Sequence, residues 1–168
     1  MKIELKSVKY FASLSEETNC FQATVWIDGK KVGTAENLGH GGPTDIDFND
    51  RRQEDKFIAY AKSLPPTVYP ARDNLPEMTI ESSADGIIDT LFDEYLAKKD
   101  EDKLDKEGKK MREANMKKGL MCTIRIKTSR AYYWKGLVSE SQVPQAIEKM
   151  SEVFRSRNEA VVEHKVLK

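Results

Sequence analysis

The 168 residues include 28 Lys and Arg against 28 Asp and Glu, so the formal net charge is zero. This balance excludes a global attraction to nucleic acid or to an anionic membrane, and any charged recognition must be local. Two cysteines are too few for a disulfide framework or a zinc site, and no apolar segment approaches the roughly 20 residues of a membrane span. A chain of this length buries roughly 70% of its unfolded surface on folding. We therefore expect one cytoplasmic domain over residues 1–168, without a cofactor or a metal.

The N-terminal part of the sequence is typical of strands. In residues 2–11, Ile3 and Leu5 alternate with charged side chains, which predicts a half-buried strand. In residues 20–37, a second alternating run reaches Asp28 and Gly29 and is followed by another extended run. Because an Asp-Gly pair tolerates the positive φ of a tight turn, this segment predicts a β-hairpin.

Helices are predicted in the middle of the chain. After a short strand at "TDIDF", Asn49 or Asp50 is placed to cap a helix, which Pro65 and Pro66 end. Four prolines and little periodicity over residues 64–79 predict a loop that crosses the domain surface, or a hinge. Ser83 then begins a second helix. Its apolar residues recur at helical spacing and predict a buried face: Ile87, Ile88, Leu91, Phe92, Tyr95 and Leu96.

Residues 98–118 are almost entirely charged, and Gly119 is placed as a helix C-cap. The pattern indicates a solvated helical extension, supported by pairs of acidic and basic side chains. The alternative is that this segment binds a partner protein.

The last third returns to β character. Residues 120–137 predict a second hairpin that turns near Ser129 and Arg130, and a helix with Pro144 in its first turn follows. The closing residues 159–168 form either a strand or the end of that helix. Together the elements predict an α+β fold. It has an antiparallel sheet with an N-terminal hairpin, two or three packing helices, and a second hairpin near the C-terminus.

The first candidate site is the loop "NLGHGG", with Gly39, His40, Gly41 and Gly42. Glycines allow backbone N–H groups to converge on an anion, and a histidine adds a donor that titrates near neutral pH. The loop is not a Walker A motif, because no Gly-Lys-Ser/Thr follows, and no helix opens directly after the glycines. A loop that only turns the chain between strands explains the same residues.

An enzymatic alternative rests on acidic residues near this loop. Asp45 and Asp47 share one face of the predicted strand, and His40 precedes them. Two carboxylates at this spacing are able to hold a divalent ion. Aspartates at a strand end or a helix cap are more often solvated or capping, so we expect no catalytic residues.

The second candidate site is the C-terminal hairpin, where cations and aromatic residues are interleaved. In proteins that bind nucleotides or single strands, aromatic side chains stack on bases and cationic side chains contact phosphates. The alternative is ordinary packing, with Tyr133 in the core and its neighbours covering a helix. The candidate ligand-binding residues are Arg125, Lys127, Arg130, Tyr132, Trp134 and Lys135.

The segment "EETNCFQATVWIDGKKVGTAENLGHGG", with "AYAKSLPP" and "IIDTLFDEYLAKKD" after it, resembles a family of small proteins of bacteriophages, prophages and plasmids. The shared pattern includes Glu16 to Thr18, Cys20-Phe21, Ile27 to Lys30, Gly33-Thr34 and Gly41-Gly42. The resemblance implies a gene on a mobile element. It brings no activity and no catalytic residues.

From these observations we expect a non-enzymatic binding protein of a phage or mobile element. It is expected to act as a counter-defence factor that sequesters a host nucleotide, nucleic acid or protein. One alternative is a small enzyme that processes nucleotides or nucleic acids, with His40, Asp45 and Asp47. Another is a protein-interaction module that uses residues 98–118.

Overall fold

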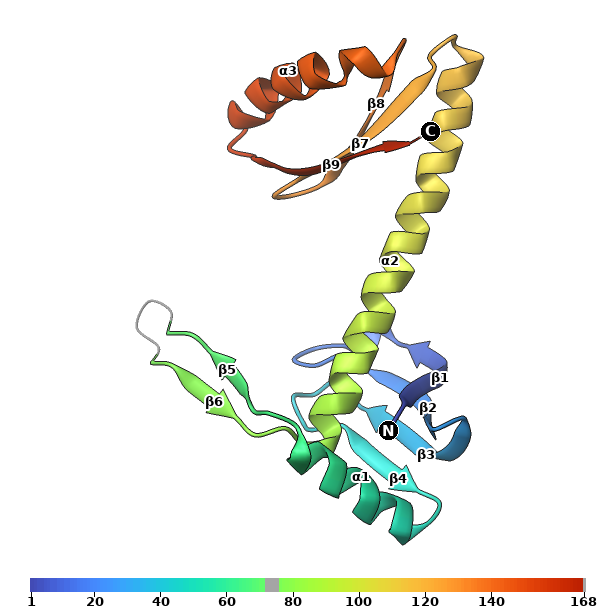
Figure 1. Cartoon of the computed structure of the whole chain (residues 1–168), viewed down its shortest axis with the longest axis vertical. Coiled ribbons are helices and arrows are strands. Elements are labelled where there is room, and N and C mark those ends of the chain that lie inside the picture. The colour runs from blue at the N-terminus through green and yellow to red at the C-terminus, as the bar shows by residue number, and fades with distance from the viewer. Residues whose placement is uncertain (72–75, 168) are drawn as a thin grey trace. The chain divides into compact units, whose positions relative to one another are not determined.

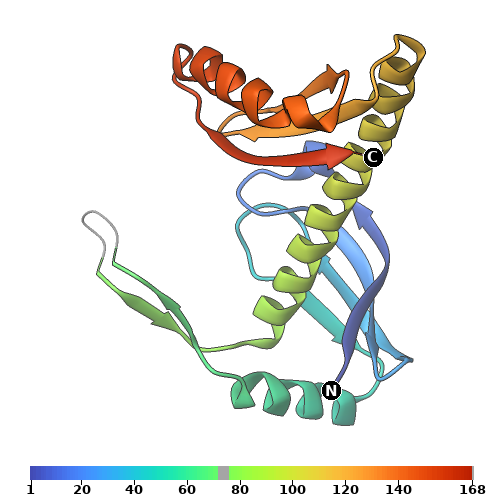
Figure 2. The same cartoon turned by 45° about the horizontal axis from the view of Figure 1, so that its top comes forward.

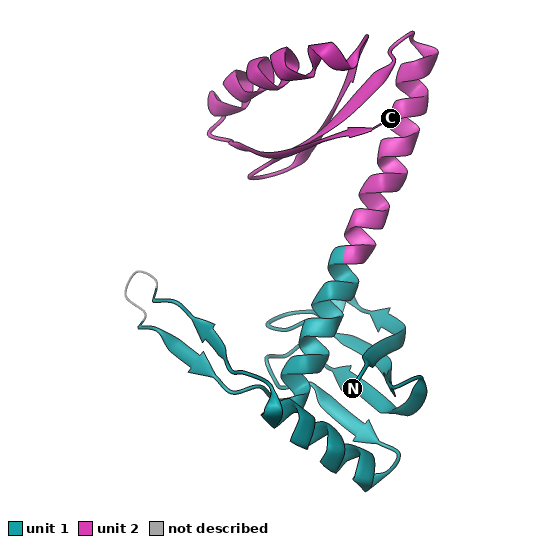
Figure 3. Ribbon diagram, in the orientation of Figure 1, with its two compact units in different colours: residues 1–97 teal, residues 98–168 magenta. Residues whose placement is uncertain are grey.

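The computed structural model describes residues 1–71 and 76–167, which form two compact units, residues 1–97 and 98–168 (Figure 3). Each unit has its own hydrophobic core. The fold is α+β, as the sequence predicted, with antiparallel sheets and hairpins in both units. A single domain over the whole chain stays a prediction, because separate cores do not decide whether two units unfold together.

Unit 1 begins with a four-stranded antiparallel sheet (Figure 1). Its order follows the chain: β1 (Ile3–Tyr10), β2 (Phe21–Ile27), β3 (Lys30–Asn37) and β4 (Asp45–Phe48), with the 3-10 turn η1 (Ala12–Leu14) after β1. The hairpin predicted around Asp28 and Gly29 joins β2 to β3. Both residues have positive φ, 48° and 80°, as the tight turns that match the twist of paired strands require.

Helices α1 (Arg51–Ser63) and α2 (Ala84–Lys117) follow, and α1 and the first half of α2 pack on one face of this sheet (Figures 1 and 2). The Asp50 side chain caps α1 by accepting the Arg52 N–H at 3.0 Å, and Ser83 Oγ accepts the Gly86 N–H at 3.3 Å in α2. Both predicted caps are therefore present. The buried core of unit 1 is Phe21, Ala23, Val25, Ile27, Val32, Ala35, Phe57, Ile88 and Phe92.

The segment predicted as a crossing loop contains a second, two-stranded sheet. Strands β5 (Thr67–Tyr69) and β6 (Met78–Ile80) pair antiparallel and extend away from the four-stranded sheet (Figures 1 and 2). Each strand is three residues long and prolines flank the strands, so alternation is too short to be recognised in the sequence. We call these two strands the arm.

Unit 2 consists of the C-terminal part of α2, then β7 (Cys122–Thr128), β8 (Tyr132–Leu137), η2 (Glu140–Gln142), α3 (Val143–Arg155) and β9 (Val161–Leu167). The sheet order is β8-β7-β9, so the closing residues form a strand rather than a continued helix. Gly119, with φ of 77°, ends α2 as predicted, and the Leu120 N–H donates to the Asn115 carbonyl at 3.0 Å.

The two faces of this sheet have different chemistry. The α3 face is apolar, with a core of Cys122, Ile124, Ile126, Leu137, Val143 and Phe154. On the other face, α2 places the buried Gly108 against Trp134, whose ring lies 3.0 Å from the position that a Cβ of residue 108 would take. Residues 98–117 are therefore helical, as predicted, and they also form a layer of unit 2.

Replacing Gly108 by Leu tests this close packing. The added side chain meets Trp134 and Leu167, and overpacking costs about 1–3 kcal/mol, despite the better helix propensity of leucine. Urea unfolding should show this loss for Gly108→Leu. Lys110→Ala, an exposed change in the same helix, should stay within about 0.5 kcal/mol of the natural chain. Equal stability of both variants would contradict the packing.

Candidate binding surfaces

The glycine loop is held by hydrogen bonds within unit 1. The Gly39 carbonyl accepts the N–H groups of Glu16 and Glu17, each at 3.0 Å, and of Thr18 at 3.3 Å. Gly39 and Gly41 have φ of 88° and 87°, and a Cβ at Gly39 would lie 2.3 Å from the Leu14 carbonyl oxygen. Glycine is therefore required at position 39 by backbone geometry and close packing.

The buried Asn37 organises this loop. Its Oδ1 accepts the Thr18 hydroxyl at 2.8 Å and the Gly39 N–H at 2.9 Å. Its Nδ2 donates to the Gly42 carbonyl and to Thr44 Oγ1, each at 3.1 Å. The Gly41 N–H donates to Thr18 Oγ1 at 3.2 Å. Two of the backbone donors expected to cradle an anion, at positions 39 and 41, thus already have partners inside the protein.

The loop is connected to α2 through Asp89, whose carboxylate accepts the Thr44 hydroxyl. Burial raises the pKa of Asp89 above its ordinary value, the Thr44 hydrogen bond opposes that rise, and the charges of Asp85 and Asp93 add to it. A hollow of about 190 Å³ lies beside this carboxylate. It is lined by Thr18, Asn19, Phe21, Asn37, Asp89, Phe92 and Asp93.

The residues of the enzymatic alternative lie on different parts of unit 1. His40 Nδ1 contacts Glu16 Oε2 at 3.1 Å, and both side chains are exposed. Asp45 and Asp47 are exposed on the face of β4 that lies opposite the core-facing Ile46 and Phe48. Among residues 1–71 and 76–167, no group of three or more His, Cys, Asp or Glu is arranged to hold a metal ion.

On the second hairpin, Arg125 lies beneath α2 within unit 2. Its side chain is 6% exposed. Its Nη2 donates to both carboxylate oxygens of Glu101 at 2.9 and 3.2 Å, and its Nη1 lies 3.5 Å from Asp105. Lys165 Nζ reaches the same two carboxylates at 3.4 Å. Arg125 therefore joins α2 to β7, and in this arrangement its charge is neutralised inside the protein.

The other candidates on this hairpin divide between packing and exposure. Trp134 is half-buried against Gly108, and Tyr133 packs on Phe154 with ring centroids 4.5 Å apart, as the packing alternative expected. Arg130, Lys135 and Tyr132 are exposed, and Lys127 Nζ lies 5.8 Å from the Tyr132 ring centroid. A ligand role for these residues stays a prediction.

The arm is the surface that sequence analysis missed. All six of its strand residues are exposed, and four are large and apolar: Val68 54%, Tyr69 51%, Met78 53% and Ile80 45%. Two short triplets rich in β-branched and aromatic residues, "TVY" and "MTI", with prolines beside each, are the signal that was available. Residues 72–75, which lie between the two strands in the sequence, are outside the described residues.

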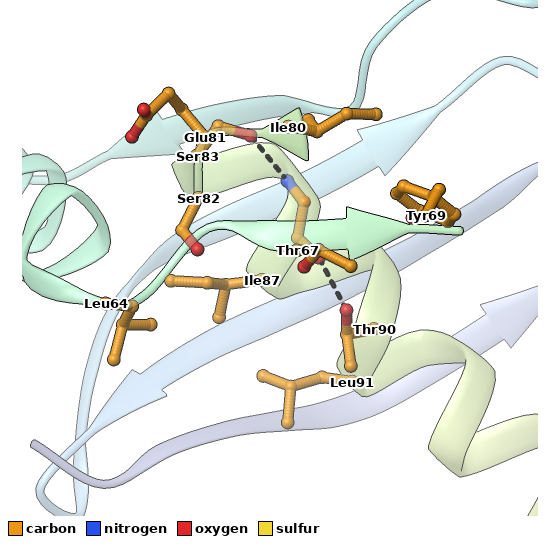
Figure 4. A pocket seen from close by; sticks show the side chains of 11 residues that line it. Leu64, Thr67, Tyr69, Ile80, Glu81, Ser82, Ser83, Ile87, Thr90 and Leu91 are labelled. Atoms are coloured by element: carbon orange, nitrogen blue, oxygen red, sulfur yellow. Dashed lines mark hydrogen bonds between the residues drawn. The ribbon is translucent and has the colours of Figure 1, made fainter. Parts of the chain in front are cut away.

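A cleft of about 370 Å³ separates one face of the arm from the start of α2 (Figure 4). Thr67, Tyr69 and Ile80 approach it from the arm, while Ile87, Thr90 and Leu91 approach it from α2. Thr90 Oγ1 donates to the Gly86 carbonyl at 2.8 Å, so this hydroxyl is already used within the helix. The cleft therefore presents mainly apolar side chains, with Glu81 as its charged lining residue.

Comparisons with known proteins assign no family: no family model matches the chain, and neither does a curated protein or a solved structure. The resemblance to proteins of mobile elements thus stays a prediction. Within the described part of the chain, no helix has the length and apolar character needed to cross a membrane.

Asn37→Ala tests the role of the glycine loop as an internally bonded turn. The change leaves the Gly39 N–H and the Thr18 and Thr44 hydroxyls without their amide partner, so we expect a loss of about 2–3 kcal/mol in urea unfolding. Leu38→Ala, at a neighbouring side chain that is 63% exposed, should change stability by less than about 0.5 kcal/mol. A stable Asn37→Ala protein would show that the loop does not depend on this amide.

The pH dependence of stability tests the ion pairs that Arg125 and Lys165 form with Glu101 and Asp105. The hydrogen bond from Arg125 holds the pKa of Glu101 below its ordinary value, and Lys165 adds to the effect. A lowered carboxyl pKa stabilises the folded chain above the unfolded-state pKa, about 4.3, and this contribution disappears as the pH falls through the folded-state pKa. Because Glu101 is 46% exposed, we expect only about 0.2–1 kcal/mol.

Glu101→Gln should therefore lower stability at pH 7 and converge with the natural chain near pH 2, as measured by urea unfolding across pH. Asp102→Asn, on the adjacent exposed residue, is the control and should follow the natural chain at every pH. Parallel curves for Glu101→Gln and the natural chain would contradict the role of the Glu101 charge.

Proposed function

We propose that this chain is a non-enzymatic protein that binds another protein through the arm and the cleft beside it. The observation that carries the proposal is the concentration of exposed apolar side chains on two short strands. Exposed apolar residues scattered singly are ordinary, whereas contiguous ones mark interaction surfaces. Here Tyr69, Met78 and Ile80 lie on one face of the arm, and the cross-strand pairs Thr67–Ile80 and Tyr69–Met78 place them together.

The strand geometry supports the same proposal. An isolated two-stranded hairpin is marginally stable in water, and each strand of such a pair has an outer edge with unpaired backbone groups. A partner that adds a strand to the arm supplies backbone hydrogen bonds, and its side chains fill apolar pockets. The cleft lined by Tyr69, Ile80, Ile87 and Leu91 provides such a pocket.

The internal hydrogen bonds of the glycine loop and of the second hairpin also favour the arm as the binding surface. In the glycine loop, Asn37 and Thr18 hold the N–H groups of Gly39 and Gly41. On the second hairpin, the Arg125 guanidinium is buried against Glu101. A ligand at either place competes with bonds that the protein already makes, whereas binding at the arm removes exposed apolar area from water.

The biological setting belongs to the same proposal. On the resemblance to phage, prophage and plasmid proteins, the chain acts in the cytoplasm of a bacterial host and sequesters a host protein as a counter-defence factor. Small accessory proteins of mobile elements commonly act by binding host proteins, nucleic acids or signalling nucleotides.

Replacing Tyr69 and Ile80 together by Ser tests the proposal. Both side chains are exposed, so folding should be preserved within about 1 kcal/mol. Apolar anchors at an interface contribute about 1–2 kcal/mol each, so the double variant should bind its partner at least about tenfold more weakly. Affinity capture from host-type cells with quantitative mass spectrometry measures which proteins lose enrichment.

The matched control is Asp45→Asn with Asp47→Asn, a double change on exposed side chains of the same unit. This control should keep every partner. If the Tyr69 and Ile80 variant retained all partners while a Lys127, Arg130 and Lys135 triple Ala variant lost them, the second hairpin would be the binding surface.

A further inference from the structure

We propose that the arm takes a basic, extended polypeptide segment, in which Lys or Arg alternates with apolar side chains. This inference rests on the proposed function and names the chemistry of the partner. It is carried by the charge around the arm and by the arrangement of two hollows beside it.

The sequence around the arm has an excess of acidic residues: residues 62–97 hold seven Asp and Glu against two basic residues, Lys62 and Arg72. Residues 76–97, which include β6 and the first part of α2, hold six acidic residues and no Lys, Arg or His. Residues 63–71, which include β5, hold no charged residue at all. The six acidic residues of 76–97 are Glu77, Glu81, Asp85, Asp89, Asp93 and Glu94. The local field thus favours a cationic partner, although the whole chain has no net charge.

Three of these carboxylates border the arm and its cleft. Glu77 precedes β6 and Glu81 follows it, and both are exposed. Glu94 is exposed on α2, four residues after the cleft residue Thr90, so the two lie on the same side of the helix. Cations on a docked strand therefore meet carboxylates at both ends of β6 and along α2.

A second hollow, of about 510 Å³, adjoins the first. Both hollows are lined by Glu81, Ser82 and Ser83, and the second also reaches Ile58 and Ala61 on α1. Lys62 is the only basic residue lining either hollow in the described part of the chain. Two adjacent apolar hollows suit an elongated segment that places side chains in both, rather than one compact ligand.

The same charges disfavour two other occupants. A nucleic acid brings phosphates against Glu77, Glu81 and Glu94, and this repulsion opposes binding. A second copy of this chain, docked arm to arm, brings the same carboxylates against themselves. Like charges across an interface lower the association rate and suppress the wrong partner.

Defined probes test the inference with the full chain. Three ten-residue fluorescent peptides carry Val at alternate positions and Lys, Gln or Glu at the others, and a ten-nucleotide single-stranded DNA is the fourth probe. Fluorescence anisotropy should show the Lys peptide binding at least tenfold more tightly than the Gln peptide. The Glu peptide and the DNA should bind most weakly. Added salt should reduce the preference for Lys.

Variants of the acidic residues show whether the preference for the Lys peptide arises at the arm. Changing Glu77, Glu81 and Glu94 to Gln should abolish the preference for the Lys peptide over the Gln peptide. Changing Glu36 to Gln together with Asp45 and Asp47 to Asn removes three exposed charges from β3 and β4 of the same unit and should leave the preference unchanged. Circular dichroism confirms that each variant is folded.

The outcomes separate the two proposals. Equal binding of the Lys and Gln peptides, or no binding of any peptide, overturns the basic-segment inference. The arm proposal survives that result if protein capture still depends on Tyr69 and Ile80. Tighter binding of the DNA also overturns the inference, in favour of a nucleic-acid partner. If capture does not depend on those two residues, the proposed function itself is wrong.

Discussion

The structure depends on α2, because this one helix packs on the four-stranded sheet of unit 1 and on the polar face of the β8-β7-β9 sheet of unit 2. Up to residue 97 its fully buried side chains are Ile88 and Phe92, and Phe92 stacks on Phe21 with ring centroids 4.0 Å apart. From residue 98 onward it buries Gly108 and Asn115 and pairs Glu101 with Arg125. The central strand β7 makes this second layer necessary. Alternate residues of a strand point to opposite faces, so Ile124 and Ile126 pack toward α3 while Arg125 packs toward α2.

This arrangement decides which surfaces remain open to a partner. A buried charge is costly unless it is paired, so the contact between Arg125 and Glu101 is part of what keeps α2 on its sheet. The glycine loop is similarly engaged, since Asn37 uses both of its donors and its acceptor oxygen within unit 1. The arm differs from both, because its side chains contribute little to either core. Its exposed apolar residues belong to neither core, and we propose that they bind a partner.

Much of the fold was predictable from local patterns, while the arm and the second role of α2 were not. Asp28-Gly29, the caps at Asp50 and Ser83, and the end of α2 at Gly119 are local signals with a backbone cause, and the structure confirms them. The arm was missed because three-residue strands are too short to show alternation. The packing face of residues 98–117 was missed because Gly108, Asn115 and Glu101 do not form an apolar stripe. Their contacts are with side chains far away in the sequence, Trp134 and Arg125 among them.

The most direct test of the central claim is site-specific photo-crosslinking in bacterial cells. A benzophenone side chain is placed at position 69 in the arm, at position 40 in the glycine loop or at position 132 in the second hairpin, one position at a time. All three residues are exposed, so the comparison is matched for access to solvent. The account predicts one discrete crosslinked protein from position 69 and none from positions 40 and 132. A discrete crosslink from position 40 or 132, with none from position 69, would contradict it.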